Sequence, residues 1–432
     1  MLVINVVGLT PRLLAHMPNV SKLGNAAALT PVLPAVTCSV QASIVTGAMP
    51  RDHGIVGNGW YFRDLGEVFL WRQHNALIQG EQIWDVTRDL KTANVCWWYA
   101  MGTNSDFVVT PRPIYHADGA KSPDAYVRPP EWHDRLVDDL GEFPLFTYWG
   151  PNAGITSSNW IVGATRKIIN EEKPDLTMVY IPHLDYDLQR FGPDSQQAID
   201  AAKAVDQALV PLLDQNPVIL SEYGITNASK AVDINRALRR EGLLEVYTQV
   251  GMEYLDPWTS RAFAVSDHQI SHVYVRDSAD IPRVRDLIAG LDGVDEVLDQ
   301  AGKEKYGLDH ERAGELVAVA EPDAWFTYYY WLDDDRAPDF AKLVEIHRKP
   351  GYDPAELFMT SKAIAAKALL RKKMGFRYEM SVVPLDPKQV SGSHGRLPDS
   401  PDDGPVLIGP WDGDSYHATD VKDLLLKELR KS

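Results

Sequence analysis

The chain has 432 residues and carries 43 Lys and Arg against 60 Asp and Glu, which gives a formal net charge of −17. This acidic balance argues against a nucleic-acid polymer or a membrane as partner, because binding to either relies on basic surface. Hydrophobic residues make up 45% and charged residues 24%, the proportions of a folded globular protein rather than a disordered one. At about 150 residues per domain, the length predicts two or three structural units.

The ends of the chain and its cysteines give an expectation for location. Residues 1–8 show no basic segment leading into an apolar stretch, so we expect no signal peptide. No run in the sequence approaches the roughly 18 apolar residues that span a bilayer. The two cysteines, Cys38 and Cys96, are too few for a disulfide framework or a Cys-rich zinc site. We therefore expect a cytoplasmic protein.

Short apolar runs alternate with amphipathic stretches from the first residue onward, a pattern typical of a parallel sheet covered by helices. We expect strands at 2–7, 177–181 and 218–220, and a helix at 194–213, where apolar residues recur at helical spacing. In such α/β sheets ligands bind beyond the carboxyl ends of the strands. Chemistry is therefore expected in the segments that follow these three strands.

The pattern changes near residue 257. Further strands are expected at 272–275, 294–298, 316–320 and 325–330, with a helix at 281–291. We therefore predict an α/β core over 1–256, a smaller inserted α+β subdomain resembling a cap over 257–376, and a return to the core over 377–432.

The most informative stretch reads L-P-A-V-T-C-S-V-Q-A-S-I-V-T-G over 33–47, followed by P-R-D-H-G-I-V-G-N over 50–58. Thr37 stands where a helix would begin, and a hydroxyl there either caps the helix or points at an anion held by its free N–H groups. The whole stretch resembles the nucleotide pyrophosphatase and type I phosphodiesterase branch of the alkaline phosphatase superfamily. In that family a threonine nucleophile precedes a helix that closes in T-G, and a P-x-x-H-G-I-V-x-N segment follows.

The resemblance implies an alkaline-phosphatase-like fold and roles for several residues. Thr37 would be the nucleophile that attacks phosphorus, and Asn58 would donate a hydrogen bond to the phosphoryl oxygen. His53 would orient the loop rather than bind metal. Cys38, beside Thr37, is a rival nucleophile that we rank lower, because no basic partner stands near it in the sequence.

A second cluster, P-H-L-D-Y-D-L-Q-R-F-G-P over 182–193, follows the strand at 177–181. Asp185 and Gln189 are four residues apart, so one helical turn puts them on the same face. The family pattern is similar, with an Asp and a His four apart ahead of an aromatic-Gly-Pro. Asp185 therefore corresponds to a metal ligand, whereas Gln189 replaces an imidazole with a weaker amide oxygen.

Two later clusters also follow the family order. The sequence S-E-Y-G-I over 221–225 occupies the place of S-D-H-G-M, so Glu222 keeps a carboxylate and Tyr223 replaces a histidine. The sequence S-G-S-H-G over 391–395 resembles G-x-H-G, which implies that His394 is a metal ligand.

The largest departure lies in the first strand, where the family has an aspartate and this chain has Val7. By strand alternation Asn5 points to the same side and can supply a compensating oxygen. His268, next to Asp267, is the other candidate for a replacement ligand. The aromatic residues at 97–99, 149 and 160 either form a stacking platform or pack the sheet.

Together these patterns predict a metal-dependent hydrolase of phosphodiester or pyrophosphate bonds, acting on a small phosphoester or nucleotide through a phosphothreonine at Thr37. The cofactor would be one or two divalent ions, Zn²⁺, Mn²⁺ or Mg²⁺. Because imidazoles are lost at Gln189 and Tyr223, we expect at most one tightly held ion, or an oxygen-rich site better suited to Mn²⁺ or Mg²⁺ than to Zn²⁺. Two alternatives stay open: a degenerate member that binds a nucleotide or phosphoester without hydrolysing it, and a relative that transfers phosphate monoesters or sulfate.

Overall fold

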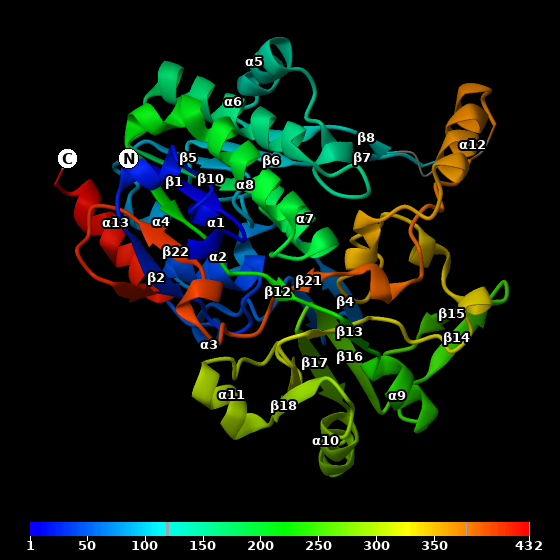
Figure 1. Ribbon diagram of the computed structural model, residues 1–432. Helices are drawn as coiled ribbons and strands as arrows, with labels where there is room; N and C mark the ends of the chain where they lie inside the picture. Colours follow the sequence, from blue (N-terminus) through cyan, green and yellow to red (C-terminus); the bar gives the residue numbers. More distant parts are fainter. Residues whose placement is uncertain (118–120, 377, 432) are drawn as a thin grey trace.

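A nine-stranded sheet forms the centre of the protein in the computed structural model, which describes residues 1–117, 121–376 and 378–431 (Figure 1). In spatial order the strands are β23 (Ser415–His417), β2 (Ala26–Thr30), β22 (Val406–Ile408), β11 (Val218–Leu220), β1 (Leu2–Val6), β10 (Leu176–Ile181), β5 (Thr92–Val95), β6 (Phe107–Pro111) and β9 (Ala125–Arg128). The neighbours from β11 to β6 are parallel, and β22 and β9 flank them antiparallel. The prediction of a central, mostly parallel sheet is confirmed, and all three expected strands lie in it.

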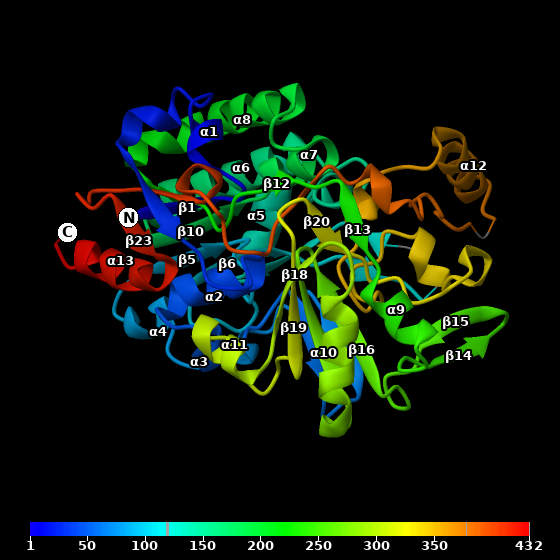
Figure 2. The same cartoon turned by 60° about the horizontal axis from the view of Figure 1, so that its bottom comes forward.

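Helices cover both faces of this sheet. Figure 2 shows α6 (Ile155–Glu172), α7 (His183–Phe191) and α8 (Gln196–Leu209) on one side, and α2 (Thr37–Thr46), α4 (Ile83–Val86) and α13 (Val421–Leu429) on the other. Side chains of β1 alternate between the two: Leu2 and Ile4 pack in the core with α6 and α8, and Val3 packs with α2 and α13. Each such fully buried side chain contributes roughly 1.5–3 kcal/mol, so the sheet is a firm base for groups at its edge.

A smaller α+β unit lies beside the main sheet. Its antiparallel sheet has the order β16 (Ala262–Asp267), β17 (Ile270–Val275), β19 (Leu316–Ala320) and β18 (Val294–Leu298), with α9 (Ile234–Arg240), α10 (Ile281–Ala289) and α11 (Gln300–Tyr306) around it. Two short strand pairs connect it to neighbouring segments, β12 (Thr226–Asn227) with β21 (Gly392–Ser393) and β13 (Lys230–Val232) with β20 (Ala324–Phe326). The domain boundaries at 256 and 376 stay predictions.

Two expected elements end earlier than the sequence pattern indicates. A strand is expected over 325–330, and that prediction is wrong beyond Phe326, where β20 ends. The chain turns there because Thr327 Oγ1 donates to Asp233 at 2.5 Å and accepts from the Tyr329 amide at 3.3 Å. The aromatic residues that follow are all buried, so their apolar run reflects a core segment rather than a strand. The helix expected over 194–213 is α8 followed by a 3₁₀ turn at Val210–Gln215, which begins next to Pro211.

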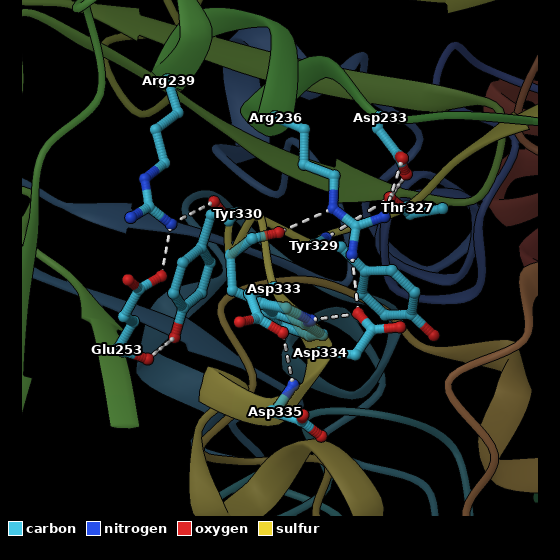
Figure 3. A network of polar contacts seen from close by, with 11 residues as sticks. Asp233, Arg236, Arg239, Glu253, Thr327, Tyr329, Tyr330, Asp333, Asp334 and Asp335 are labelled. Atoms are coloured by element: carbon cyan, nitrogen blue, oxygen red, sulfur yellow. Dashed lines mark hydrogen bonds and ion pairs between the residues drawn. The ribbon is translucent and has the colours of Figure 1, made fainter. Parts of the chain in front are cut away.

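Arginines of α9 attach this aromatic segment to the small unit. Arg236 donates to the carbonyl oxygen of Trp331 at 2.7 Å and to Asp334 at 3.0 Å, and Arg239 donates to the carbonyl oxygen of Tyr330 at 3.1 Å (Figure 3). These charge-assisted bonds hold the loop that follows β20.

The remaining elements are short or lie at the periphery. They are α1 (Pro11–Leu14), α3 (Pro50–His53), β3 (Gly59–Phe62), β4 (Glu67–Leu70), β7 (Ile114–Tyr115), β8 (Lys121–Ser122), α5 (Glu131–Leu140), β14 (Val246–Gln249), β15 (Met252–Leu255) and α12 (Lys362–Lys373). Within the described residues, every helix is too short or too polar to cross a bilayer.

Candidate active site

The carboxyl ends of three neighbouring strands meet at one edge of the main sheet. The strand register pairs Val6 with Ile181 and Asn5 with Leu220, so β1, β10 and β11 end at the same level. The segments that follow them, together with the start of α2 and the residues after β16 and β21, converge there. Hydrogen bonds, ring contacts and close approaches connect the predicted site residues at this edge: Asn5, Thr37, Asn58, Asp185, Gln189, Glu222, His268 and His394.

Thr37 is the first residue of α2 and does not cap it. The capping position belongs to Val36, which has no side-chain cap bond. The Thr37 hydroxyl instead lies 3.2 Å from the Tyr223 hydroxyl, which donates to Asp185 Oδ1 at 3.2 Å. A phenol has one hydrogen and a carboxylate only accepts, so this hydrogen goes to Asp185 and the Thr37 hydroxyl is the donor to Tyr223.

Asn58 is held beside the start of α2 by both ends of its side chain. Its Oδ1 accepts from the Cys38 amide at 3.0 Å, and its Nδ2 donates to Asp267 Oδ1 at 3.1 Å. The backbone amide of Asn58 donates to the other Asp267 oxygen at 2.8 Å. Burial raises the pKa of Asp267 to about 6, and these two hydrogen bonds oppose that rise. Asn58 keeps a second Nδ2 hydrogen for another acceptor.

Glu222 is clamped by two amides. Its Oε1 accepts from Asn5 Nδ2 at 2.5 Å and from Gln41 Nε2, and Gln41 Oε1 in turn accepts from the Trp98 amide at 2.8 Å. Burial raises the pKa of Glu222 to about 8, and the hydrogen bonds from Gln41 and Asn5 oppose that rise. Asn5 thus offers the carboxyl an N–H group. Val7 packs with Leu2 and Ile4 on the opposite face of the sheet.

Asp185 and Gln189 share one face of α7, as their spacing predicts. Gln189 Nε2 donates to Asp185 Oδ2 at 2.7 Å. His394 Nδ1 donates to the carbonyl oxygen of Ala35 at 2.8 Å, so the imidazole lone pair is on Nε2. That Nε2 has no hydrogen-bond partner and lies 3.8 Å from Asp185 Oδ1. Burial lowers the pKa of His394 to about 3 and raises the pKa of Asp185 to about 6, so the imidazole is neutral at pH 7.

Four aromatic rings stack in a column along these groups. The ring of Tyr223 lies 3.6 Å from His394 with an interplanar angle of 7°, His394 lies 3.7 Å from His268, and His268 lies 3.7 Å from Tyr352. At the far end the Tyr352 hydroxyl donates to Gln189 Oε1 at 2.9 Å. Burial lowers the pKa of His268 well below its usual range. The column fixes the orientation of both histidines.

The donor chemistry fits one cation better than two. In the part of the chain that the structure describes, no group of three or more His, Cys, Asp or Glu side chains is arranged to hold a metal ion. The Asp185 carboxylate and the unpartnered His394 Nε2 form a pair that fits one divalent ion, with Gln189 contributing its oxygen after rotation of its amide. Near Thr37, Glu222 Oε1 already accepts from two N–H groups and Tyr223 is a neutral phenol, while Glu222 Oε2 and Asn5 Oδ1 are buried without a hydrogen-bond partner among the described residues. These two oxygens, without an imidazole beside them, are a weaker ligand set for a divalent ion.

Of the tryptophans expected either to form a stacking platform or to pack the sheet, two lie next to the site and two lie in the hydrophobic cores. Trp98 touches the site through Gln41, and Trp149 lies 5.7 Å from the ring of Tyr352. Trp97 and Trp160 pack in the hydrophobic cores on the two faces of the sheet.

Two neighbours of the nucleophile motif are held in neutral forms. Burial raises the pKa of the Cys38 thiol well above its usual range, which disfavours a thiolate. His53 Nδ1 accepts from the Ile55 amide at 3.1 Å and its Nε2 lies 2.8 Å from Ser43 Oγ, so His53 ties its loop to α2.

Sequence reasoning missed Gln41, Tyr352 and the role of Asp267. Gln41 lies four residues after Thr37, and helical spacing alone puts it on the same face of α2. Tyr352 lies 163 residues from Gln189 and Asp267 lies 209 residues from Asn58, without a local signal that connects either pair.

Comparisons with known proteins agree with this architecture. The sequence profile of type I phosphodiesterase / nucleotide pyrophosphatase matches residues 1–353. A venom phosphodiesterase of Naja atra is 23% identical over 238 residues, which cover 51% of this chain and 24% of the relative. An uncharacterised pyrophosphatase/phosphodiesterase of Schizosaccharomyces pombe is 24% identical over 249 residues, covering 51% of this chain and 42% of the relative. The matches thus span less than half the length of these curated relatives.

Solved structures share the fold over nearly the whole chain. Phosphonoacetate hydrolase from Sinorhizobium meliloti, in complex with phosphonoformate, has a TM-score of 0.65 and 16% identity, covering 99% of this chain and 95% of that one. An inactive threonine-to-alanine variant of murine ectonucleotide pyrophosphatase / phosphodiesterase 5, in complex with AMP, has a TM-score of 0.60 and 14% identity, covering 100% and 94%. At this identity the likeness concerns the fold.

Proposed function

Because the chain belongs to the type I phosphodiesterase / nucleotide pyrophosphatase family, we propose that it hydrolyses a small phosphodiester or pyrophosphate with Thr37 as nucleophile. This proposal rests on the Thr37 hydroxyl. It lies at the start of α2, does not cap the helix and forms a hydrogen bond with Tyr223. A helix N-terminus favours a negatively charged group, so the phosphoryl group would lie where this hydroxyl can reach it.

In the proposed reaction Thr37 Oγ attacks phosphorus and passes its proton to the Tyr223 oxygen as Tyr223 passes its own to Asp185 Oδ1, and the leaving group departs with the electron pair of its bond to phosphorus. Asn58 would donate its second Nδ2 hydrogen to a phosphoryl oxygen as negative charge develops there, because Asp267 and the Cys38 amide already fix its orientation. The resulting phosphothreonine is then cleaved by water, which restores the hydroxyl.

One divalent cation is part of the proposal. Asp185 and His394 would hold it, with the Gln189 oxygen as a further ligand. When bound, such an ion neutralises charge on a phosphoryl oxygen. Zn²⁺, Mn²⁺ and Mg²⁺ are the ions to compare, and the oxygen-rich ligand set favours Mn²⁺ or Mg²⁺.

The charge of the site favours a diester over a monoester. Among the residues that the structure describes, neither a lysine nor an arginine forms an ion pair or hydrogen bond with Asp185, Glu222 or Asp267. A doubly charged monoester would therefore meet carboxyl groups without a compensating side-chain cation. A singly charged diester would meet less electrostatic repulsion from these carboxyl groups. A nucleotide is a reasonable substrate class, since one structural relative was solved with AMP.

The test compares bis(p-nitrophenyl) phosphate with p-nitrophenyl phosphate, using the full chain supplied with Mn²⁺, Mg²⁺ or Zn²⁺. We expect faster turnover of the diester, and loss of turnover in Thr37→Ala. The matched control is Thr46→Ala at the other end of α2, where the hydroxyl donates within the helix to the Ala42 carbonyl oxygen. Unchanged turnover in Thr37→Ala would refute the nucleophile. Calorimetric binding of AMP without turnover of either ester would instead support a non-hydrolytic binding protein.

A further inference from the structure

The small unit reaches the site through the tip of one hairpin. Strands β16 and β17 pair up to Asp267 and Ile270, so the turn between them consists of His268 and Gln269 alone. His268 has a φ of 59°, a left-handed conformation that tight hairpin turns usually give to glycine or asparagine. A histidine kept in this strained conformation points to a function for the side chains of the tip.

Three successive residues of the tip contact two residues of the site. Asp267 accepts hydrogen bonds from Asn58. The ring of His268 lies 3.7 Å from the ring of His394, and the Gln269 amide donates to the carbonyl oxygen of His394 at 2.8 Å. All three residues of the tip are at most 3% exposed. The tip is therefore packed into the site and fixed against the main unit.

We propose that Asp267 is a positioning residue that holds Asn58 ready for the phosphoryl oxygen. This inference rests on the proposed function, in which Asn58 donates to that oxygen. Asp267 Oδ2 accepts from the Asn58 backbone amide at 2.8 Å, and Oδ1 accepts from the Asn58 side chain at 3.1 Å. One carboxyl group thus fixes both the backbone and the side-chain amide of the same residue.

The contacts of Asp267 also decide which way the Asn58 amide faces. A carboxylate oxygen accepts, so the NH₂ group of Asn58 is turned toward Asp267, and Oδ1 is turned toward the Cys38 amide at 3.0 Å. The opposite orientation would place oxygen against oxygen and N–H against N–H. The second Nδ2 hydrogen is therefore held in a defined direction beside the start of α2, and an ordered donor needs no reorganisation when charge develops on the phosphoryl oxygen.

Electrostatics separates positioning from direct binding. A carboxyl group near a phosphoryl group is unfavourable, because both carry negative charge. The place of Asp267 in the site is therefore explained by the residue it holds and not by contact with the substrate. Through this carboxyl group the small unit takes part in catalysis at the edge of the main sheet.

The first experiment is a double-mutant cycle on diester turnover by the full chain with Mn²⁺. We expect Asp267→Ala to lower kcat by about 10- to 100-fold and to change KM by less than about twofold, because Asn58 stays but loses its orientation. Asp267→Asn, which keeps one acceptor oxygen, should recover part of this loss. In an Asn58→Ala chain, adding Asp267→Ala should lower kcat no further. Full kcat in Asp267→Ala, or independent losses in the double variant, would overturn the positioning role.

The matched control is Asp206→Ala on α8, a helix that contributes no residue to the site. Asp206 is buried and likewise accepts from the backbone amide and the side-chain Nδ2 of one asparagine, Asn19, at 3.0 and 2.7 Å. We expect both aspartate variants to lose stability in urea denaturation, and only Asp267→Ala to lose kcat. An equal fall of kcat in the two variants would show that the loss reflects destabilisation, and would refute the inference.

A sulfur-substituted diester gives a readout that a loss of packing would not change. Sulfur in place of a non-bridging phosphoryl oxygen is a weaker hydrogen-bond acceptor. The ratio of oxygen-diester to sulfur-diester rates should therefore be smaller in Asn58→Ala and in Asp267→Ala than in the wild type, and should keep its wild-type value in Asp206→Ala. A wild-type ratio in Asp267→Ala would contradict an action through Asn58.

Failure of the proposed function would be visible separately. If the wild type hydrolyses neither ester, the same cycle is read from AMP binding by calorimetry. Asn58→Ala and Asp267→Ala should then weaken AMP binding by the same factor, and an unaffected Asp267→Ala would refute the inference. A wild type that hydrolyses the diester beside a fully active Asp267→Ala would refute the inference alone. A wild type that neither hydrolyses the diester nor binds AMP would refute both.

Discussion

The two halves of the site differ in what their hydrogen bonds leave available. On the α7 side, both oxygens of Asp185 already accept, from Tyr223 and from Gln189, and the atom left without a partner in the described part of the chain is His394 Nε2, 3.8 Å from Asp185 Oδ1. On the β1 side, Glu222 Oε1 accepts from Asn5 and Gln41, while Glu222 Oε2 and Asn5 Oδ1 are buried without a partner there. The presence of a carboxylate is therefore a poor guide to metal binding, since the neighbouring donors decide whether its oxygens can serve as ligands.

The largest expected effect comes from neutralising one carboxyl in each half. Asp185→Asn removes the charge that faces the proposed cation, and we expect kcat/KM to fall on the order of 10²- to 10³-fold, since such charge stabilisation is worth several kcal/mol. Glu222→Gln replaces a carboxyl whose pKa is raised to about 8 by a neutral side chain of the same shape. We expect this variant to keep activity within about tenfold. The rate of diester hydrolysis at pH 7 with Mn²⁺ gives kcat/KM for both variants. Equal losses of kcat/KM would show that the two carboxyl groups contribute alike to catalysis.

The pH dependence of stability distinguishes the halves in metal-free protein. The pKa of Glu222 rises from 4.5 to about 8 on folding, so between these values the folded state holds a proton that the unfolded state has released. Its contribution to the free energy of unfolding is therefore lost as the pH rises through this window. The pKa of His394 falls from 6.5 to about 3, so its contribution is present above pH 6.5 and is lost as the pH falls through that window.

Urea denaturation at a series of pH values checks these opposite slopes. Glu222→Gln should reduce the fall in stability toward pH 8, and His394→Asn should reduce the fall toward pH 3, each by a few kcal/mol at most. His53 and His272, which are also buried with lowered pKa values, keep part of the acid slope in both variants. A Glu222→Gln protein with the unchanged slope above pH 5 would contradict the raised pKa of this carboxyl.

Local patterns predicted the parts of this site that lie on one element. The spacing of Asp185 and Gln189 put them on one helical face, and alternating apolar runs gave the strands whose ends meet at the site. Alternation did not hold at Val7, because β1 ends at Val6 and the next side chain turns into the opposite core. The clamp on Glu222, by contrast, joins residues 217 and 181 positions apart, and no local period encodes such pairs.

The smallest expected effect lies at the end of the ring column. Tyr352→Phe keeps the stack on His268 and removes the hydrogen bond to Gln189 Oε1, which is 2.9 Å long. We expect a loss of about 0.5–1.5 kcal/mol in the free energy of unfolding, the usual net value of such a bond. Activity should change by less than about threefold, because Gln189 still donates to Asp185.

A double-mutant cycle makes this last prediction specific to the α7 half. If Tyr352 acts through Gln189, then adding Tyr352→Phe to a Gln189→Leu variant should cost no further stability, since the acceptor is already gone. Fully additive losses in urea denaturation would mean that the Tyr352 hydroxyl stabilises the fold by another route. A coupling confined to Tyr352, Gln189 and Asp185, with none to Glu222, would indicate that the α7 half is organised independently of the amide clamp on Glu222.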